Sequence, residues 1–169
     1  MPNRIATFEK VSYAEFKTSI LKLIDSTVKD DIIRDMYDNI KLPIRATAGS
    51  AGYDFFAPFS FTTTAGDSVI IPTGIRCKID EGWYLGCYPR SGLGFKYRMA
   101  LDNTVGIIDS DYYYSENEGH IMLKLHSAKD ITVDESKAFA QGIFTQYGIT
   151  TDDDVTETRN GGFGSTDNK

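Results

Sequence analysis

The stretch IRCKIDEGWYLGCY, residues 75–88, decides the fold class of this sequence. Its first five residues alternate apolar and charged side chains, and its last six alternate again after Asp80-Glu81-Gly82. A period of two places alternate side chains on opposite faces of a strand. Two such runs joined by a short glycine-containing turn predict a β-hairpin with one buried face.

The same pattern continues on both sides of this stretch. From Lys41 onward glycines recur, and short runs of β-branched and aromatic residues are separated by turn signals. Ile121, Leu123 and Leu125 alternate with polar neighbours, and further strands are expected at residues 131–133 and 139–144. Many short strands predict a mainly β fold, a barrel or a sandwich.

The first 40 residues read differently. A short strand at residues 4–11 precedes Ser12 and Glu15, which have the spacing of a helix capping box, and Val11 and Phe16 occupy the positions of a hydrophobic staple. One amphipathic helix should follow, and a second is expected at about residues 28–40. We therefore expect three parts: an added strand and helical pair at 1–40, a β domain at 41–150 and a flexible arm at 151–169.

Composition excludes several classes of function. The net charge of -6 argues against binding DNA or RNA, which requires Lys and Arg to neutralise phosphates. No run of about 20 apolar residues predicts a membrane span, and the N-terminus lacks a signal-peptide pattern, so a cytoplasmic protein is expected. Cys77 and Cys87 are expected to be thiols of the core or surface rather than a disulfide or metal site.

The hexapeptide Pro89-Arg90-Ser91-Gly92-Leu93-Gly94 is the first segment with the composition of a site. Arginine presents a planar fork of donors to phosphate oxygens, serine adds a hydroxyl, and glycine lets backbone amides approach an anion. The residues alone leave open an ordinary glycine turn with a surface arginine.

The second segment, residues 103–112, reads NTVGIIDSDY. An apolar run that ends in acids places a carboxylate at the end of a buried strand, where desolvation can tune it as a general base. Asp109 is the candidate base, and a simple turn is the alternative.

The third segment is Gly161-Gly162-Phe163-Gly164-Ser165-Thr166, in the arm. It lacks the lysine of a P-loop, but an aromatic ring and two hydroxyls on a mobile arm suit a lid over a nucleotide. A glycine-rich tail without function is the alternative. Metalloprotease, hydrolase-elbow and dinucleotide motifs are absent from the sequence, and His120 and His126 are expected to be solvated residues of one strand rather than ligands.

Taken in order, these segments resemble the five motifs of the trimeric dUTPase family, of the phage and bacterial kind. The motifs are 51–54 (AGYD), 89–94, 103–112, Ala140-Gln141 with the residues before them, and 159–166, so the resemblance spans roughly Lys41 to Lys169. It implies a jelly-roll-like β-barrel, a homotrimer with three sites at subunit interfaces, and Mg²⁺-dependent hydrolysis of dUTP to dUMP and pyrophosphate, which keeps uracil out of DNA.

The resemblance also assigns a role to individual residues. Asp109 activates the attacking water, Asn103 hydrogen-bonds uracil, and Tyr112 lies against the deoxyribose. Asp54 helps to position the metal through bound water. The remaining substrate-binding residues are Arg90, Ser91 and Gln141 for the phosphates, Arg159, Ser165 and Thr166 for the outer phosphates, Phe163 for stacking on the base, and Gly92, Gly106, Ile108 and Gly164.

The sequence departs from the family pattern at three places. After Tyr112 the family's Arg and Gly are absent and the segment to Gly119 is longer, Ser136 and Ala138 replace a Gly and an Arg around Lys137, and a helical pair is added. We expect the two added helices to pack against the outside of the barrel. A nucleotide-gated regulatory protein that binds a partner through residues 12–40 or 112–119 is an alternative function, and a dCTP deaminase of the same fold is another, although deaminases lack the complete glycine-rich arm.

Overall fold

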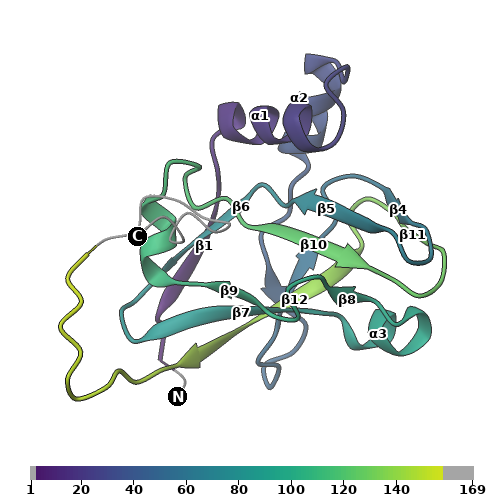
Figure 1. The fold of residues 1–169 in the computed structure, drawn as a ribbon. Helices are drawn as coiled ribbons and strands as arrows, with labels where there is room; N and C mark the ends of the chain where they lie inside the picture. The colour runs from purple at the N-terminus through teal and green to yellow at the C-terminus, as the bar shows by residue number, and fades with distance from the viewer. Residues whose placement is uncertain (1–2, 158–169) are drawn as a thin grey trace.

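The computed structural model describes residues 3–157, which fold mainly as antiparallel β-structure with a few helices (Figure 1). Within those residues, none of the helices is long and apolar enough to cross a lipid bilayer. The elements, in chain order, are β1 (Ala6–Lys10), α1 (Tyr13–Leu23), α2 (Asp30–Asp38), β2 (Ile44–Arg45), β3 (Tyr53–Phe56), β4 (Phe61–Thr63), β5 (Ser68–Pro72), β6 (Ile75–Ile79), β7 (Trp83–Pro89), α3 (Ser91–Tyr97), β8 (Ala100–Leu101), β9 (Gly106–Ile108), the 3-10 helix η1 (Ser110–Tyr114), β10 (Met122–His126), β11 (Ile131–Val133) and β12 (Ala138–Gln146).

The described strands form four antiparallel sheets rather than one closed barrel. The largest has the order β2-β3-β12-β7-β9, and the others are β5-β10-β8, β1-β6 and β4-β11. Strands far apart in the sequence are neighbours in every sheet, which is typical of a jelly-roll-like fold. The mainly β class expected from the sequence is confirmed.

The expected hairpin at residues 75–88 is wrong, although its alternation is right. Ile75, Cys77 and Ile79 are buried, but β6 pairs with β1, with Cys77 opposite Phe8. β7 belongs to another sheet, between β12 and β9. Alternation specifies which face of a strand is buried and does not specify the partner strand. The turn at Gly82, whose φ is 81°, therefore leads from one sheet to the next.

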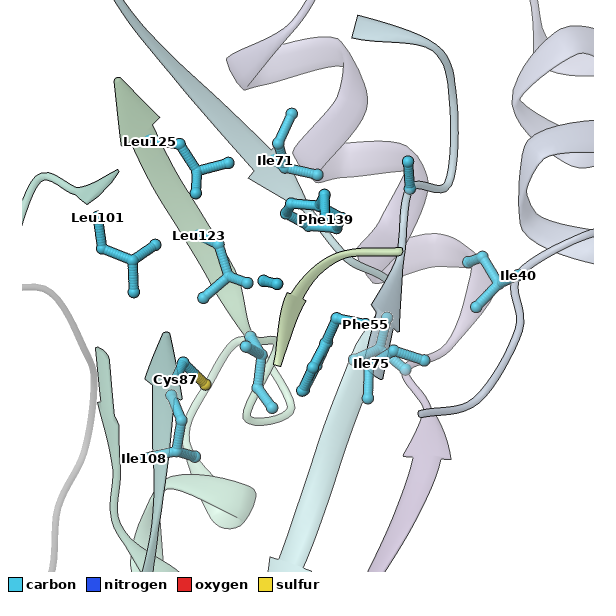
Figure 2. Packing of buried hydrophobic residues seen from close by; sticks show 14 of the residues in the cluster. Ile40, Phe55, Ile71, Ile75, Cys87, Leu101, Ile108, Leu123, Leu125 and Phe139 are labelled. Atoms are coloured by element: carbon cyan, nitrogen blue, oxygen red, sulfur yellow. The ribbon is translucent and has the colours of Figure 1, made fainter. Parts of the chain in front are cut away.

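One hydrophobic core joins the sheets (Figure 2). Phe55, Leu85 and Phe139 come from the three central strands of the largest sheet and are 1% exposed or less. Leu123 and Leu125, from the alternating run of β10, are also buried, as expected. Both cysteines are free core thiols, and burial raises the pKa of Cys87 to about 12.

The helical pair packs on the β-structure as expected. The Ser12 hydroxyl accepts a hydrogen bond from the Glu15 amide at 3.2 Å and caps α1. Val11 and Phe16, the expected staple, are 1% and 0% exposed, and Ile20 is also buried. The lower face of α1 is therefore part of the same hydrophobic core as the strands.

Two expectations about polar residues near α1 are corrected. The Glu15 side chain does not close the capping box, because the Ser12 amide donates instead to Glu118, 106 positions away. His120 is fully buried rather than solvated, because it precedes β10 and lies under α1, where it bonds Ser19 and Glu15. Of the two histidines, only His126 lies on β10, and its side chain is partly exposed.

Candidate active site

Three of the expected site residues meet in the largest sheet because their strands are neighbours. Asp54 of β3 lies opposite Gln141 of β12, and Arg90 follows the end of β7, whose Tyr88 also lies opposite Gln141. The Arg90 Nε lies 3.3 Å from the Asp54 Oδ1, and the Gln141 Nε2 donates to the Pro89 carbonyl at 3.3 Å. Motifs that are 35 to 90 positions apart in the sequence thus form one polar group.

A cavity of about 810 Å³ lies beside this group. Arg90, Ser91 and Gly92 line it, and so do Lys96 and Lys137, which makes the cavity cationic. The hexapeptide forms the short helix α3 instead of the glycine turn that was its alternative, and Arg90 is its N-cap residue. Lys137, which lies between Ser136 and Ala138 at the departure in the fourth motif, is one of the two lysines in this lining.

The 103–112 segment lines a second cavity, of about 320 Å³. Asn103, Gly106, Ile108 and Tyr112 all border it, and Ile70, Met122 and Leu123 supply much of its apolar wall. This volume is at the lower end of the range for small-molecule sites, about 300–1,000 Å³. An apolar cavity with one amide and one phenol can hold a planar base and its sugar in a fixed orientation.

Asp102 adds a polar network at the rim of this smaller cavity. Its carboxylate accepts from His126 Nδ1 at 2.7 Å and lies 3.2 Å from the Lys124 Nζ. Desolvation alone would raise the pKa of Asp102, but hydrogen bonds from His126, Ser68 and Lys124 outweigh it and hold that pKa below its usual value. Asp102 therefore keeps its charge and fixes Lys124, a residue of the cavity wall.

Asp109 and Tyr112 are joined by η1. Asp109 directly follows β9 and is the N-cap residue of η1, and its backbone carbonyl accepts from the Tyr112 amide at 3.2 Å. The buried Tyr112 hydroxyl donates to the His120 carbonyl at 2.9 Å and accepts from the Asn117 side chain at 2.8 Å. The candidate base and the candidate sugar contact are thus positioned by one turn.

The single chain holds these groups in two separate places. Ile108 lies opposite Leu85 on β7, so Asp109 projects beyond that pair while Arg90 follows the other end of the strand. Leu85 and Arg90 are five residues apart, which is about 17 Å along a strand at about 3.3 Å per residue. The two cavities share no lining residue. Residues Arg159, Phe163, Gly164, Ser165 and Thr166 lie outside the described residues.

Several residues of the site were not identified from the sequence. The outward members of β10, Met122 and Lys124, line the smaller cavity, and the alternation of that strand was a signal that could have found them. Asp102 gave no signal beyond its place next to Asn103. Among residues 3–157, no three His, Cys, Asp or Glu side chains come close enough to hold a metal ion.

Known proteins are similar to this chain in sequence and in fold. The sequence model of the dUTPase family matches residues 38–167. The deoxyuridine 5'-triphosphate nucleotidohydrolase of Lactococcus lactis is 36% identical over 132 residues, which cover 75% of this chain and 88% of the relative. A crystal structure of dUTPase from Streptococcus mutans has a TM-score of 0.62 at 28% identity, over 85% of this chain and 97% of that one.

A third likeness concerns the fold alone. A mutant dUTPase from phage phi11 of S. aureus, which coordinates a structural Mg(II) ion, has a TM-score of 0.58 at 18% identity, over 73% of this chain and 95% of that one. The family model, in contrast, matches residues 38–167, a range that includes every segment from Ala51 to Thr166. With a family pattern over most of its length and a relative above 30% identity, this chain belongs to the dUTPase family.

Proposed function

We propose that this protein hydrolyses dUTP to dUMP and pyrophosphate, at sites built between copies of the chain in a homotrimer. Family membership supports the reaction, and the relative from L. lactis carries the corresponding name. The separation of the two groups of site residues supports the shared site. Arg90 and Asp109 of one copy stand at opposite ends of β7, whereas a second copy can bring its own Asp109 to the cavity beside Arg90.

In this proposal Asp109 is the general base. It removes a proton from the water that attacks the α-phosphorus in line with the departing pyrophosphate. A positioned carboxylate base contributes about 10²- to 10⁴-fold to such a step. Its place at the boundary of β9 and η1 ties it rigidly to two hydrogen-bonded elements, which limits the reorganisation that the step requires.

The smaller cavity is assigned to deoxyuridine. Asn103 hydrogen-bonds the uracil edge, so cytosine would leave polar groups unpaired, and Gly106 and Ile108 form the floor. Tyr112 packs against the sugar where a 2′-hydroxyl would stand. Because its own hydroxyl is bonded to residues 117 and 120, the ring cannot move aside to admit ribose.

The cationic cavity is assigned to the phosphates. Arg90, Ser91 and Gly92 line it and bind them, Gln141 assists from beside Pro89, and Lys137, also in the lining, replaces the missing family cation. In the arm, Arg159, Ser165 and Thr166 bind the outer phosphates, and Phe163 and Gly164 cover the base. A stacked aromatic ring is worth about 1 to 3 kcal/mol per base and shields the site from bulk solvent, while the attacking water stays beside Asp109.

Magnesium fits this donor set as a metal that arrives with the substrate. Mg²⁺ is usually bound through one or two carboxylates together with substrate phosphates rather than by an all-protein cage. Asp54, beside Arg90, is the carboxylate that would hold its water. When bound, the ion neutralises phosphate charge and aligns the leaving group. We expect EDTA to abolish turnover and leave the melting temperature unchanged.

The separation of Arg90 from Asp109 is the observation that carries the proposal. The test is incubation of the purified protein with dUTP, dCTP and UTP in the presence of Mg²⁺, with chromatographic identification of the products. We expect dUMP and pyrophosphate from dUTP, and little turnover of the other two. Formation of dUTP from dCTP would identify a deaminase instead, and no product from dUTP would overturn the proposal.

A further inference from the structure

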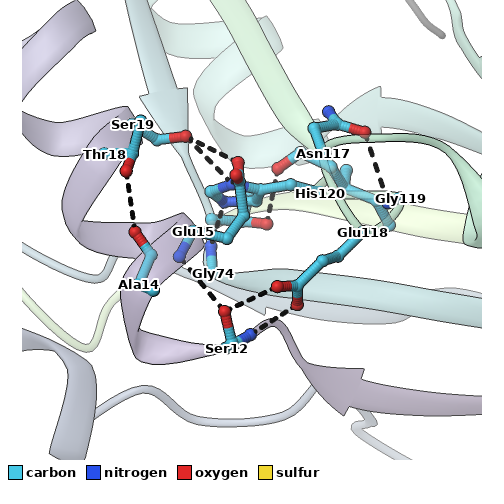
Figure 3. Close-up of polar contacts among 12 residues, drawn as sticks. Ser12, Ala14, Glu15, Thr18, Ser19, Gly74, Asn117, Glu118, Gly119 and His120 are labelled. Carbon is cyan, nitrogen blue, oxygen red and sulfur yellow. Dashed lines mark hydrogen bonds and ion pairs between the residues drawn. The ribbon is translucent and has the colours of Figure 1, made fainter.

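We infer that Glu118 is a positioning residue, which clamps helix α1 to the segment that holds Tyr112 and thereby sets the preference for deoxyribose over ribose. The inference rests on the proposed function. It concerns two of the three places where this chain departs from the family pattern, the helical pair before residue 41 and the longer segment after Tyr112. In the structure these two additions contact each other directly (Figure 3).

The first step is the clamp between Glu118 and Ser12. The Ser12 amide donates to the Glu118 Oε2 at 2.7 Å, and its hydroxyl donates to the Oε1 at 2.6 Å. Desolvation would raise the pKa of Glu118, but these bonds and the positive charge of Arg76 hold it below its usual value. Hydrogen bonds to an ionised acceptor are the stronger kind, so the start of α1 is fixed to residue 118.

The second step is the backbone around residue 118, whose conformation is tightly constrained. Glu118 has a φ of 58°, a left-handed conformation that is costly for a residue with a Cβ, and Gly119 has a φ of 71°. A Cβ on Gly119 would come within 2.6 Å of the Tyr113 Cα and 2.8 Å of the Tyr112 carbonyl oxygen. The segment is therefore folded directly against the residue whose ring lines the smaller cavity.

The third step is His120, whose side chain makes a second connection between the same helix and the β-structure. Its Nε2 accepts from the Gly74 amide at 2.8 Å, so in the neutral ring the proton is on Nδ1. That Nδ1 lies 3.1 Å from the Glu15 carboxylate and 3.2 Å from the Ser19 hydroxyl, both on α1. The side chain thus spans from the helix to the turn between β5 and β6, and its own backbone is held in place.

The last step is the Tyr112 hydroxyl. It is bonded to the carbonyl of residue 120 and to the side chain of Asn117, the two neighbours of the clamped pair 118–119. The start of α1 is thus connected to Tyr112 by hydrogen bonds at both ends of the short backbone segment 117–120. Without the Glu118 clamp, residues 117–120 can relax, the ring can shift, and space for a 2′-hydroxyl opens.

The test compares Glu118→Ala with Glu116→Ala, a matched control on the same segment whose side chain is exposed. For each variant, kcat and KM are measured with dUTP and with UTP, together with the melting temperature. We expect Glu118→Ala to lower the ratio of kcat/KM for dUTP to that for UTP about tenfold, mainly through improved use of UTP, since lost charge-assisted bonds are of this size. Glu116→Ala should retain the ratio of the wild type.

Two further variants separate positioning from simple destabilisation. Tyr112→Phe keeps the ring but removes both hydroxyl bonds, so it should lower the ratio as Glu118→Ala does, and the double variant should fall no further. Glu118→Gln retains one acceptor and should recover part of the ratio. Reduced turnover of both substrates with an unchanged ratio would overturn the inference, whatever the melting temperature. Absence of dUTP turnover in the wild type would instead overturn the proposed function.

Discussion

Asp109 is the residue on which the proposed chemistry depends most. Asparagine has the same shape but cannot accept the proton of the attacking water, so Asp109→Asn should lower kcat about 10²- to 10⁴-fold while the Kd for dUTP stays close to that of the wild type. Single-turnover kinetics and equilibrium binding measure the two effects. Asp67→Asn, at an exposed turn before β5, is the control. Near-normal turnover of Asp109→Asn would show that the base is another group.

The lowered pKa of Glu118 also leads to a prediction about how the stability of the fold depends on pH. Its pKa in the folded protein lies below the usual 4.5, so its bonds to Ser12 stabilise the fold fully above that value and are lost as the pH falls through the lower, folded pKa. Arg76, His120 and Tyr37 are the titratable groups that interact with it. Urea unfolding at pH 7 and at pH 4 should show a smaller loss of stability for Glu118→Gln than for the wild type. An equal loss in both proteins would contradict this assignment.

At the scale of single residues, the sequence predicted the parts of the site that are contiguous in the chain and missed contacts between residues far apart in the chain. Asn103, Gly106, Ile108 and Tyr112 line one cavity because they belong to one strand and turn, which a contiguous motif can indicate. His120 was predicted to be solvated from its neighbours in the sequence, but its partners are on α1, about 100 positions earlier. Pattern alone does not reveal a contact between segments so far apart.

Helix α1 is integral to the fold, and two of its isoleucines test this. Ile20 is 1% exposed within the core, whereas Ile24, at the C-cap, is 39% exposed. Ile20→Ala should lower the free energy of unfolding by about 2 to 5 kcal/mol, and Ile24→Ala by less than about 1 kcal/mol. Denaturant titration monitored by circular dichroism measures both. Equal effects would mean that α1 only decorates the surface.

The elements themselves were predictable to different degrees. The strand at residues 131–133 and both N-terminal helices follow from local periodicity and capping, and the structure contains them. The pairing of β6 with β1 instead of β7 did not follow, because register is a property of two strands and the sequence pattern describes one. Helix α3 was missed since glycines at 92 and 94 disfavour helices in isolation.

On the scale of the whole molecule, the chain places Arg90 and Asp109, the residues proposed for phosphate binding and catalysis, at opposite ends of β7. The fold keeps each group rigid by setting it on paired strands, and in the proposed function one copy does not close a site around one nucleotide by itself. Symmetric assembly solves this, because every copy can complete the site of its neighbour. The order of motifs in the sequence predicted which residues act together, and the register of β7 and β9 supports the proposal that they do so between copies.

Mixing of two inactive variants tests this claim most directly. Arg90→Ala and Asp109→Asn chains, each nearly inactive alone, are co-expressed with different affinity tags, and trimers that carry both tags are purified and assayed with dUTP. If each site takes Arg90 from one copy and Asp109 from another, every trimer that carries both tags has one complete site of three and should show about a third of wild-type activity. If both residues served the same copy, the mixed trimers would stay as inactive as the separate variants, and the account would be contradicted.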